Sequence, residues 1–536
     1  MPLLSVVIPT LDRPDTLRHA LATLAAQTAQ DCEFVIQNNG GNAEIEALVA
    51  ALGDPRFRHF STPGIVTMTE NWEAALAQAR GDYVTFIGDD DGLLPDACAM
   101  AERLLADRET EILSWAPYVY YWPGYQDPGF RNRLVAEIDF AVTAERVPSR
   151  SLLQRFYGFQ THYSRLPMIY NSFIRRSVIE RMHARCGRYF LGLSPDVTSG
   201  IVNAALTAEF VLLSRPLSVS GASQYSTGHN SYFRPGDALG SARGRRDFGP
   251  VVKDARLPDL DSFALFLAQD MLLAQQALFP DDAAVSLDFK ALAQAVATGI
   301  NDRPERYDET LGSIAALAER HGFGLDEIVV PSRSAERAPL GTGVTVRGAG
   351  RVLFRLDGDA LGLASIADAA RVMAQFTPVG DAAISVRSAA LPLLTGQGLD
   401  FARGGSGIGA LAEGWSEPED WGVWSVAKTC RLRLRLDPVP TAPIRIGLAC
   451  RAFVHERHPW LRVACSAGET SIGSWNFAPA SALGHRSFRL DPGSLDADGA
   501  LTLTFALDNP RSPAELGLNS DIRPLGLGLE RLWIEG

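Results

Sequence analysis

Apolar and polar positions along the first 115 residues follow the spacing of strands and helices in turn. Residues 4–8 are apolar without interruption, as in a buried strand, and residues 17–24 then carry apolar side chains at helical spacing. The succession continues with strands at 34–36, 83–87 and 111–115 and with helices at 45–52, 72–79 and 97–105. This strict alternation predicts an α/β fold whose parallel-centred sheet is flanked by helices on both faces.

The pattern changes twice further along the chain. From about residue 253 to residue 323 the apolar positions keep helical spacing, with no strand signal between them. Residues 331–339 are polar and have the composition of a linker. Beyond them the period becomes two, in the stretches 432–436, 444–448 and 501–507, which Gly and Pro turns separate. Alternation of this kind is typical of a β-sandwich or jelly roll.

We therefore expect three parts in the chain. They are an α/β domain over residues 1–240, a helical segment and linker over 241–335, and an all-β sandwich over 340–536. A length of 536 residues fits about three or four domains of ordinary size.

Composition and charge narrow the class of protein. The formal charge of −12 repels phosphate backbones, so we expect no nucleic-acid partner. No GxGxxG follows the first strand and no GxxxxGK[ST] occurs, which excludes the common dinucleotide and P-loop sites. The most apolar long stretch, 263–279, is interrupted by polar residues, so we expect peripheral membrane contact at most.

The sequence also predicts a compartment. It begins with an apolar strand and no basic region, which is not the pattern of a signal peptide. The six cysteines are scattered and form no CxxC pair, as suits a reducing cytosol. We expect a cytoplasmic protein that at most contacts the inner face of the membrane, and the sequence leaves its oligomeric state open.

Three adjacent carboxylates carry the strongest chemical signal. Asp89, Asp90 and Asp91 follow the strand at 83–87, within the segment GDDDGLLP at 88–95. Adjacent carboxylates repel one another unless a cation or many donors neutralise them, and Mg²⁺ or Mn²⁺ takes oxygen ligands. The alternative is a solvated acidic turn before a helix.

Other strand ends carry polar residues as well. Thr10, Asp12 and Arg13 follow the first strand, and Asn38 and Asn39 follow the second. Parallel sheets bind ligands at the carboxyl ends of their strands, so these residues and the acidic tripeptide should share one crevice. This placement favours a binding site over a turn.

Four motifs together resemble the family 2 glycosyltransferases, which have a GT-A fold. They are SVVIPTLDR at 5–13, EFVIQNNG at 33–40, NWEAALAQARGDYV at 71–84 and GDDDGLLP at 88–95. The resemblance covers roughly residues 3–230. It implies inverting transfer of a sugar from a UDP-, dTDP- or GDP-sugar to a glycan or glycolipid acceptor, as in bacterial surface polysaccharide synthesis.

The resemblance also implies roles for individual residues. In the family the acidic segment holds Mn²⁺ or Mg²⁺ on the donor diphosphate, which corresponds here to Asp90 and Asp91. The implied donor-binding residues are Pro9, Thr10, Asp12, Arg13, Asn38, Asn39 and Asp89. Two positions depart from the family pattern. Gly88 replaces the first aspartate, and Asn38 replaces the acidic residue that usually contacts the nucleobase, so the identity of the donor's nucleobase stays open.

Two further candidates lie in the second half of the domain. Asp196, in LSPDVTSG at 193–200, matches the family's general base, although an aspartate here also has the pattern of a helix cap. His229 closes the polar run SGASQYSTGH at 220–229 and is a candidate third metal ligand, against the alternative of an exposed loop histidine.

The alternative function is a non-catalytic protein that binds a nucleotide-sugar or glycan. Gly88 and Asn38 leave this reading open, and six of the nine tryptophans fall in the β-rich part, where aromatic rings stack on sugars or fill a core. The resemblance and the acidic segment favour the enzyme.

Overall fold

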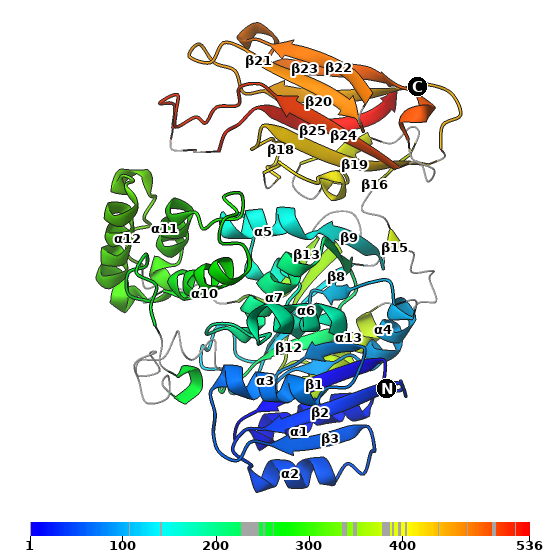
Figure 1. Cartoon of the computed structure of the whole chain (residues 1–536), viewed down its shortest axis with the longest axis vertical. Coiled ribbons are helices and arrows are strands. Elements are labelled where there is room, and N and C mark those ends of the chain that lie inside the picture. The colour runs from blue at the N-terminus through cyan, green and yellow to red at the C-terminus, as the bar shows by residue number, and fades with distance from the viewer. Residues whose placement is uncertain are drawn as a thin grey trace. The chain divides into compact units, whose positions relative to one another are not determined.

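The computed structural model of the chain divides into two compact units, each described here by itself (Figure 1). The first comprises Met1–Val346 and Arg351–Ser385, and the second comprises Arg347–Gly350 and Val386–Gly536. The residues described are 2–106, 108–139, 142–226, 246–249, 252–260, 262–334, 340–346, 351–377, 386–387, 391–394, 398–402, 405–416, 418–437, 439–468, 470–495, 500–519, 521 and 523–535.

The main sheet of the first unit has a parallel centre. Strands β1 (Leu4–Thr10), β2 (Cys32–Asn38), β3 (Phe57–Ser61) and β4 (Tyr83–Phe86) are parallel, in the order β4-β1-β2-β3. Beyond β4 the sheet continues through β10 (Ser172–Arg175), β6 (Ile112–Trp115), β11 (Glu209–Leu213) and β9 (Ala144–Pro148). Strand β10 is antiparallel to both of its neighbours. The carboxyl ends of β1, β2 and β4 therefore lie at one edge.

Helices cover both faces of this sheet because successive side chains of a strand point to opposite sides. Val7 of β1 lies in one core with α3 (Met68–Gln78) and α7 (Pro195–Leu206). Val6 and Ile8 lie in the opposite core with α1 (Pro14–Ala25), α2 (Ala43–Ala50) and α4 (Ala97–Leu105). The predicted α/β fold is confirmed.

The helical segment shares the first of these cores. Helices α10 (Phe263–Leu278), α11 (Phe289–Thr298) and α12 (Tyr307–His321) bury apolar side chains together with those of α5 (Ser149–Tyr157) and α7. Helix α6 (Arg176–Cys186) also packs there. Among the described residues, no helix combines the length and apolar character needed to cross a membrane.

A second sheet lies beside the acidic segment. It runs β13-β14-β8-β7-β12-β5, with bounds Gly343–Val346, Arg351–Asp357, Arg133–Asp139, Tyr118–Tyr121, Ser218–Ala222 and Gly92–Leu93. Helix α13 (Ile366–Phe376) buries Ile366 and Met373 against Tyr118 and Tyr120 of this sheet. The β14–β8 ladder and the apolar face of α13 place residues 351–377 in the first unit.

The second unit is a two-sheet β structure, as the sequence predicted. One sheet runs β16-β19-β24-β21-β22, with bounds Leu391–Leu394, Thr429–Asp437, Ala500–Leu507, Leu461–Ala467 and Thr470–Phe477. The other runs β17-β25-β20-β23, with bounds Gly398–Asp400, Leu527–Glu535, Ile444–Ala452 and Leu483–Leu490. Leu432 and Leu503 of the first sheet and Leu448 and Leu529 of the second are fully buried in one core. Trp415 lies in this core, whereas Trp460 is 51% exposed.

Candidate functional site

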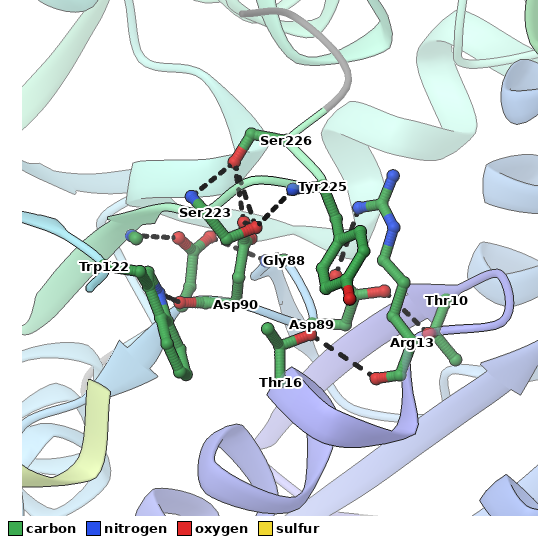
Figure 2. Close-up of polar contacts among 12 residues, drawn as sticks. Thr10, Arg13, Thr16, Gly88, Asp89, Asp90, Trp122, Ser223, Tyr225 and Ser226 are labelled. Carbon is green, nitrogen blue, oxygen red and sulfur yellow. Dashed lines mark hydrogen bonds and ion pairs between the residues drawn. The ribbon is translucent and has the colours of Figure 1, made fainter. Parts of the chain in front are cut away.

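The ends of β1 and β4 meet at Asp89. Thr10, the last residue of β1, donates from Oγ1 to Asp89 Oδ2 at 2.6 Å, and Arg13 Nη1 lies 3.2 Å from Asp89 Oδ1 (Figure 2). Burial, the largest influence, and the charge of Asp90 raise the pKa of Asp89, while Arg13 and Thr10 act to lower it. Thr10, Arg13 and Asp89 thus lie together in the structure, as expected from their positions at the ends of strands.

Asp91 holds two backbone segments together. Its Oδ2 accepts the N–H of Gly88 at 2.7 Å, and its Oδ1 accepts the N–H of Gly221 in β12 at 2.6 Å. Burial and the charge of Asp90 raise the pKa of Asp91 to about 8. Both oxygens of Asp91 are thus engaged by the main chain.

Asp90 faces a pair of hydroxyls. Its Oδ2 accepts from Ser223 Oγ at 2.6 Å and from Ser226 Oγ at 2.7 Å, and its main-chain oxygen accepts from Trp122 Nε1 at 3.0 Å (Figure 2). A Cβ on Gly221 would collide with that main-chain oxygen, so glycine is required where β12 passes the acidic segment. The polar run at 220–229 contains His229, the predicted third metal ligand, which lies outside the described residues. No sequence pattern singled out Ser223 and Ser226 of the same run.

Gly88, the departure from the family pattern, has a steric cause. A Cβ built on Gly88 would lie 2.9 Å from Asp90 Oδ1, 3.0 Å from Asp91 Oδ2 and 3.1 Å from the Tyr170 hydroxyl. Three oxygens therefore converge on the space that a side chain at residue 88 would need. Glycine leaves that space to them.

The residues after β2 mainly shape their own loop. Asn38 donates from Nδ2 to the Asn42 carbonyl at 2.8 Å, and Asn39 accepts the Val66 N–H on Oδ1 at 2.9 Å. Asn42, which the sequence reading missed, caps α2 and donates to Asp12 Oδ1 at 3.1 Å.

The exposure of the predicted donor-binding residues differs. Pro9, Thr10, Asn38 and Asn39 are buried, Arg13 is partly exposed and Asp12 is exposed. Asp12 also has a left-handed backbone, with φ 53°, which turns the chain between β1 and α1.

Asp196 approaches the same region from α7. It is the second residue of the helix and is partly exposed, and burial raises its pKa. Its charge acts on Tyr163 and Tyr170: burial and then Asp196 raise the pKa of Tyr163 to about 12. The pKa of Tyr170 is raised by burial and by the charges of four aspartates, so Tyr170 lies near all of them: Asp91, Asp90, Asp196 and Asp89. No sequence pattern marked Tyr170, which stacks on Trp72 with ring centroids 5.1 Å apart.

The cation predicted from the sequence can be tested against these residues. Among the described residues there is no cluster of three or more His, Cys, Asp or Glu side chains able to hold a metal ion. Among the described residues, the site gathers three buried carboxylates, Asp89, Asp90 and Asp91, and Arg13 forms an ion pair with the first of them. Mg²⁺ is commonly held by one or two carboxylates together with substrate phosphates. The site fits a cation of that kind at Asp90.

Comparison with known proteins gives a match of the same region. The sequence profile described as Glycosyl transferase family 2 matches residues 5–182. The Campylobacter jejuni GalNAc(5)-diNAcBac-PP-undecaprenol beta-1,3-glucosyltransferase is 32% identical over 100 residues, which are 18% of this chain and 32% of that protein. The chain thus spans about a third of the length of this curated relative.

Two solved structures have weaker likenesses. Staphylococcus aureus TarS 1–349 in complex with UDP-GlcNAc is 15% identical, with 61% of this chain and 93% of that one covered and a TM-score of 0.36. The Pyrobaculum calidifontis mannosyltransferase PcManGT in complex with GDP-Man and Mn²⁺ is 14% identical, with 59% and 81% covered and a TM-score of 0.32. TM-scores this low place no constraint on the ligands of this chain.

Proposed function

We propose that the protein transfers a sugar from a nucleoside diphosphate to an acceptor hydroxyl with inversion at the anomeric carbon. Residues 5–182, which match the profile described as Glycosyl transferase family 2, support this proposal. The observation that carries the proposal is the convergence of Arg13, Asp89 and Asp90 from separate strand ends. Such a convergence is where parallel sheets bind ligands.

Exposure divides the donor-binding residues by task. Arg13 and Asp12 are accessible and are proposed to contact the UDP-, dTDP- or GDP-sugar directly. Thr10, Asn38 and Asn39 are buried and are proposed to hold the loops that shape the nucleoside pocket.

We assign the divalent cation, Mn²⁺ or Mg²⁺, to Asp90. Asp89 is already paired with Arg13, and Asp91 already accepts two backbone N–H groups, so Asp90 is the carboxylate best suited to a cation. When bound, the cation neutralises charge on the departing diphosphate. Ser223 and Ser226 orient Asp90 by their hydrogen bonds to its Oδ2.

Asp196 is proposed to act as the general base. Its carboxylate takes the proton of the acceptor hydroxyl while that oxygen forms a bond to the anomeric carbon, and the bond from this carbon to the diphosphate breaks with its electron pair leaving on the diphosphate. The raised pKa of Asp196 suits the task, because a base works best when its pKa lies closer to the operating pH.

The acceptor is proposed to be a glycan or a glycolipid, in keeping with the undecaprenol-linked acceptor in the name of the Campylobacter relative. We propose a cytoplasmic location, in keeping with the scattered spacing of the six cysteines. Peripheral contact with the inner face of the membrane would bring it to a lipid-linked acceptor.

Release of nucleoside diphosphate from a panel of UDP-, dTDP- and GDP-sugars tests the proposal. The full chain is incubated with each donor and Mn²⁺, with and without a mixture of glycan and polyprenol-linked acceptors, and with excess chelator as control. We expect one nucleotide class to be consumed, faster with acceptor and only with the cation. Tight donor binding without turnover across the panel would instead favour the non-catalytic binding protein.

A further inference from the structure

A buried carboxylate from the helical segment reaches the loop in front of Asp196. Asp270 of α10 is fully buried. Its Oδ1 accepts the N–H of Leu193 and its Oδ2 accepts the N–H of Ser194, each at 2.7 Å. Asp270 lies 77 positions from Leu193 and 76 from Ser194 along the chain, so this is a tertiary contact between two different parts of the unit.

This contact adds an acceptor just in front of α7, whose next amides, those of Asp196 and Val197, bond to the Asp196 carboxyl. Ser194 is the N-cap of α7, yet its side chain makes no capping hydrogen bond to the helix. The first N–H groups of a helix have no partners within it, and negative charge near them is stabilising. Asp270 binds the amides of the cap residue and the residue before it, and Asp196 follows the cap by two positions.

The loop backbone is adapted to this carboxylate. Gly192 has φ 65°, and a Cβ on it would collide with Asp270 Oδ1. Burial raises the pKa of Asp270 to about 7, while the Leu193 and Ser194 amides act to lower it.

We propose that Asp270 is a positioning residue for sugar transfer: by binding the Leu193 and Ser194 amides it fixes the loop that aims Asp196 at the acceptor hydroxyl. The helical segment is then part of the catalytic apparatus. This inference rests on the proposed role of Asp196 as general base.

A second carboxylate that binds the segment before this loop, from a different helix, supplies a matched control. Glu73 of α3 accepts the N–H groups of Tyr189 and Phe190, both on Oε1 and both at 2.6 Å. Glu73→Gln keeps an oxygen that can accept both bonds. Asp270→Asn cannot do so, because Asp270 uses both of its oxygens and an amide nitrogen only donates.

The test compares the full-length variants Asp270→Asn, Glu73→Gln and Gly192→Ala. Turnover is the release of nucleoside diphosphate from UDP-, dTDP- and GDP-sugars, and binding is measured with UDP, dTDP and GDP in the presence of Mn²⁺. We expect Asp270→Asn to lower kcat by about 10- to 100-fold, the effect of a misplaced catalytic group, with nucleotide Kd within about twofold of wild type. Glu73→Gln should leave both unchanged.

Gly192→Ala disturbs the same contact without altering the carboxylate, so it keeps the test decisive if Asp270→Asn does not fold. It should reproduce the selective loss of kcat. Amide hydrogen exchange gives a readout apart from activity: exchange at residues 191–196 should be faster in both variants. Unchanged kcat in a folded Asp270→Asn, or a parallel loss of kcat and nucleotide binding in both variants, would overturn the positioning role.

Asp196→Asn in the same assays separates this inference from the proposed function. If Asp196→Asn abolishes turnover while Asp270→Asn does not, only the positioning role fails. If Asp196→Asn is itself fully active, the base assignment fails and the inference fails with it.

Discussion

Arg13 and Asp89 form an ion pair, with 3.2 Å between Arg13 Nη1 and Asp89 Oδ1, where the ends of β1 and β4 meet. The Arg13 and Asp89 side chains are 19% and 3% exposed, so water has little access to the pair. Because Asp89 is satisfied by Arg13 and Thr10, the three adjacent carboxylates are not equivalent. Asp89 is paired with Arg13, Asp91 accepts two backbone N–H groups, and Asp90, to which we propose that the cation binds, accepts two serine hydroxyls.

This inequality predicts opposite effects of two neighbouring substitutions. Asp91→Asn leaves the N–H of Gly88 or Gly221 without an acceptor, which should lower the free energy of unfolding by about 1–3 kcal/mol. Asp90→Asn keeps an oxygen for Ser223 and Ser226, so stability should change little, but its charge is gone. Melting curves with and without Mn²⁺ and UDP should show ligand stabilisation lost in Asp90→Asn and retained in Asp91→Asn. The reverse pattern would contradict the assignment of the cation to Asp90.

The crossing of β12 over the acidic segment predicts a steric effect. Gly221→Ala places a methyl group against the Asp90 main-chain oxygen and should cost about 1–3 kcal/mol of stability and displace Asp90, weakening cation-dependent binding of UDP. Gly312→Ala is the control: no atom lies within 4 Å of its Cβ position in α12, so it should stabilise the protein by about 0.4–1 kcal/mol. Equal effects of the two substitutions on UDP binding would rule out this steric explanation.

Much of this fold could be predicted from the sequence because its signals are local. Apolar runs and helical spacing predicted the elements from β1 to β6 apart from two strands: β3, whose five residues FRHFS show no apolar run, and β5, which has only two residues. The strand ends could be paired with a ligand site because parallel strands end at one edge. The place of residues 351–377 could not be predicted, since it depends on the β14–β8 ladder between segments more than 200 positions apart.

The candidate site could also be predicted only as far as local sequence patterns reach. Thr10, Arg13 and Asp89 could be grouped from their positions after strands, but which carboxylate is paired depends on partners such as Gly221 and Ser223 that no local pattern identifies. Asp270 is a single carboxylate within a helical pattern and gave no signal. Its contact with Leu193 exists only in the folded chain.

The extent of the first unit predicts where the chain can be divided. A fragment of residues 1–385 should fold and bind UDP with Mn²⁺, because it keeps β13, β14 and α13. A fragment of residues 1–340 loses Ile366 and Met373, which are 0% and 1% exposed, and so bares the Tyr118 and Tyr120 face. Gel filtration should show the longer fragment as a compact species and the shorter as aggregated. A stable, UDP-binding 1–340 fragment would contradict this boundary.

The pKa of Asp270 predicts a pH dependence of stability. Burial raises it from 3.8 to about 7, so between about pH 4 and pH 7 the native carboxyl keeps a proton that the unfolded one has lost. The free energy of unfolding should therefore fall as pH rises through this window and level off above it. Asp270→Asn lacks this contribution, so the stability of wild type relative to the variant should decrease from pH 5 to pH 7 and stay constant from pH 7.5 to pH 8.5. A difference that grows with pH would contradict the raised pKa.

We propose that this protein is an enzyme whose general base is Asp196, and one substitution tests that role. Asparagine cannot take a proton, so Asp196→Asn should lower kcat by about 10²- to 10⁴-fold while the donor Kd stays unchanged. Asp288→Asn is the matched control: Asp288 caps α11 away from the site by accepting the N–H groups of Lys290 and Ala291, and asparagine caps a helix about as well. If Asp196 is the general base, only Asp196→Asn should show the large loss of kcat. An Asp196→Asn protein with the same kcat as Asp288→Asn and wild type would contradict this role.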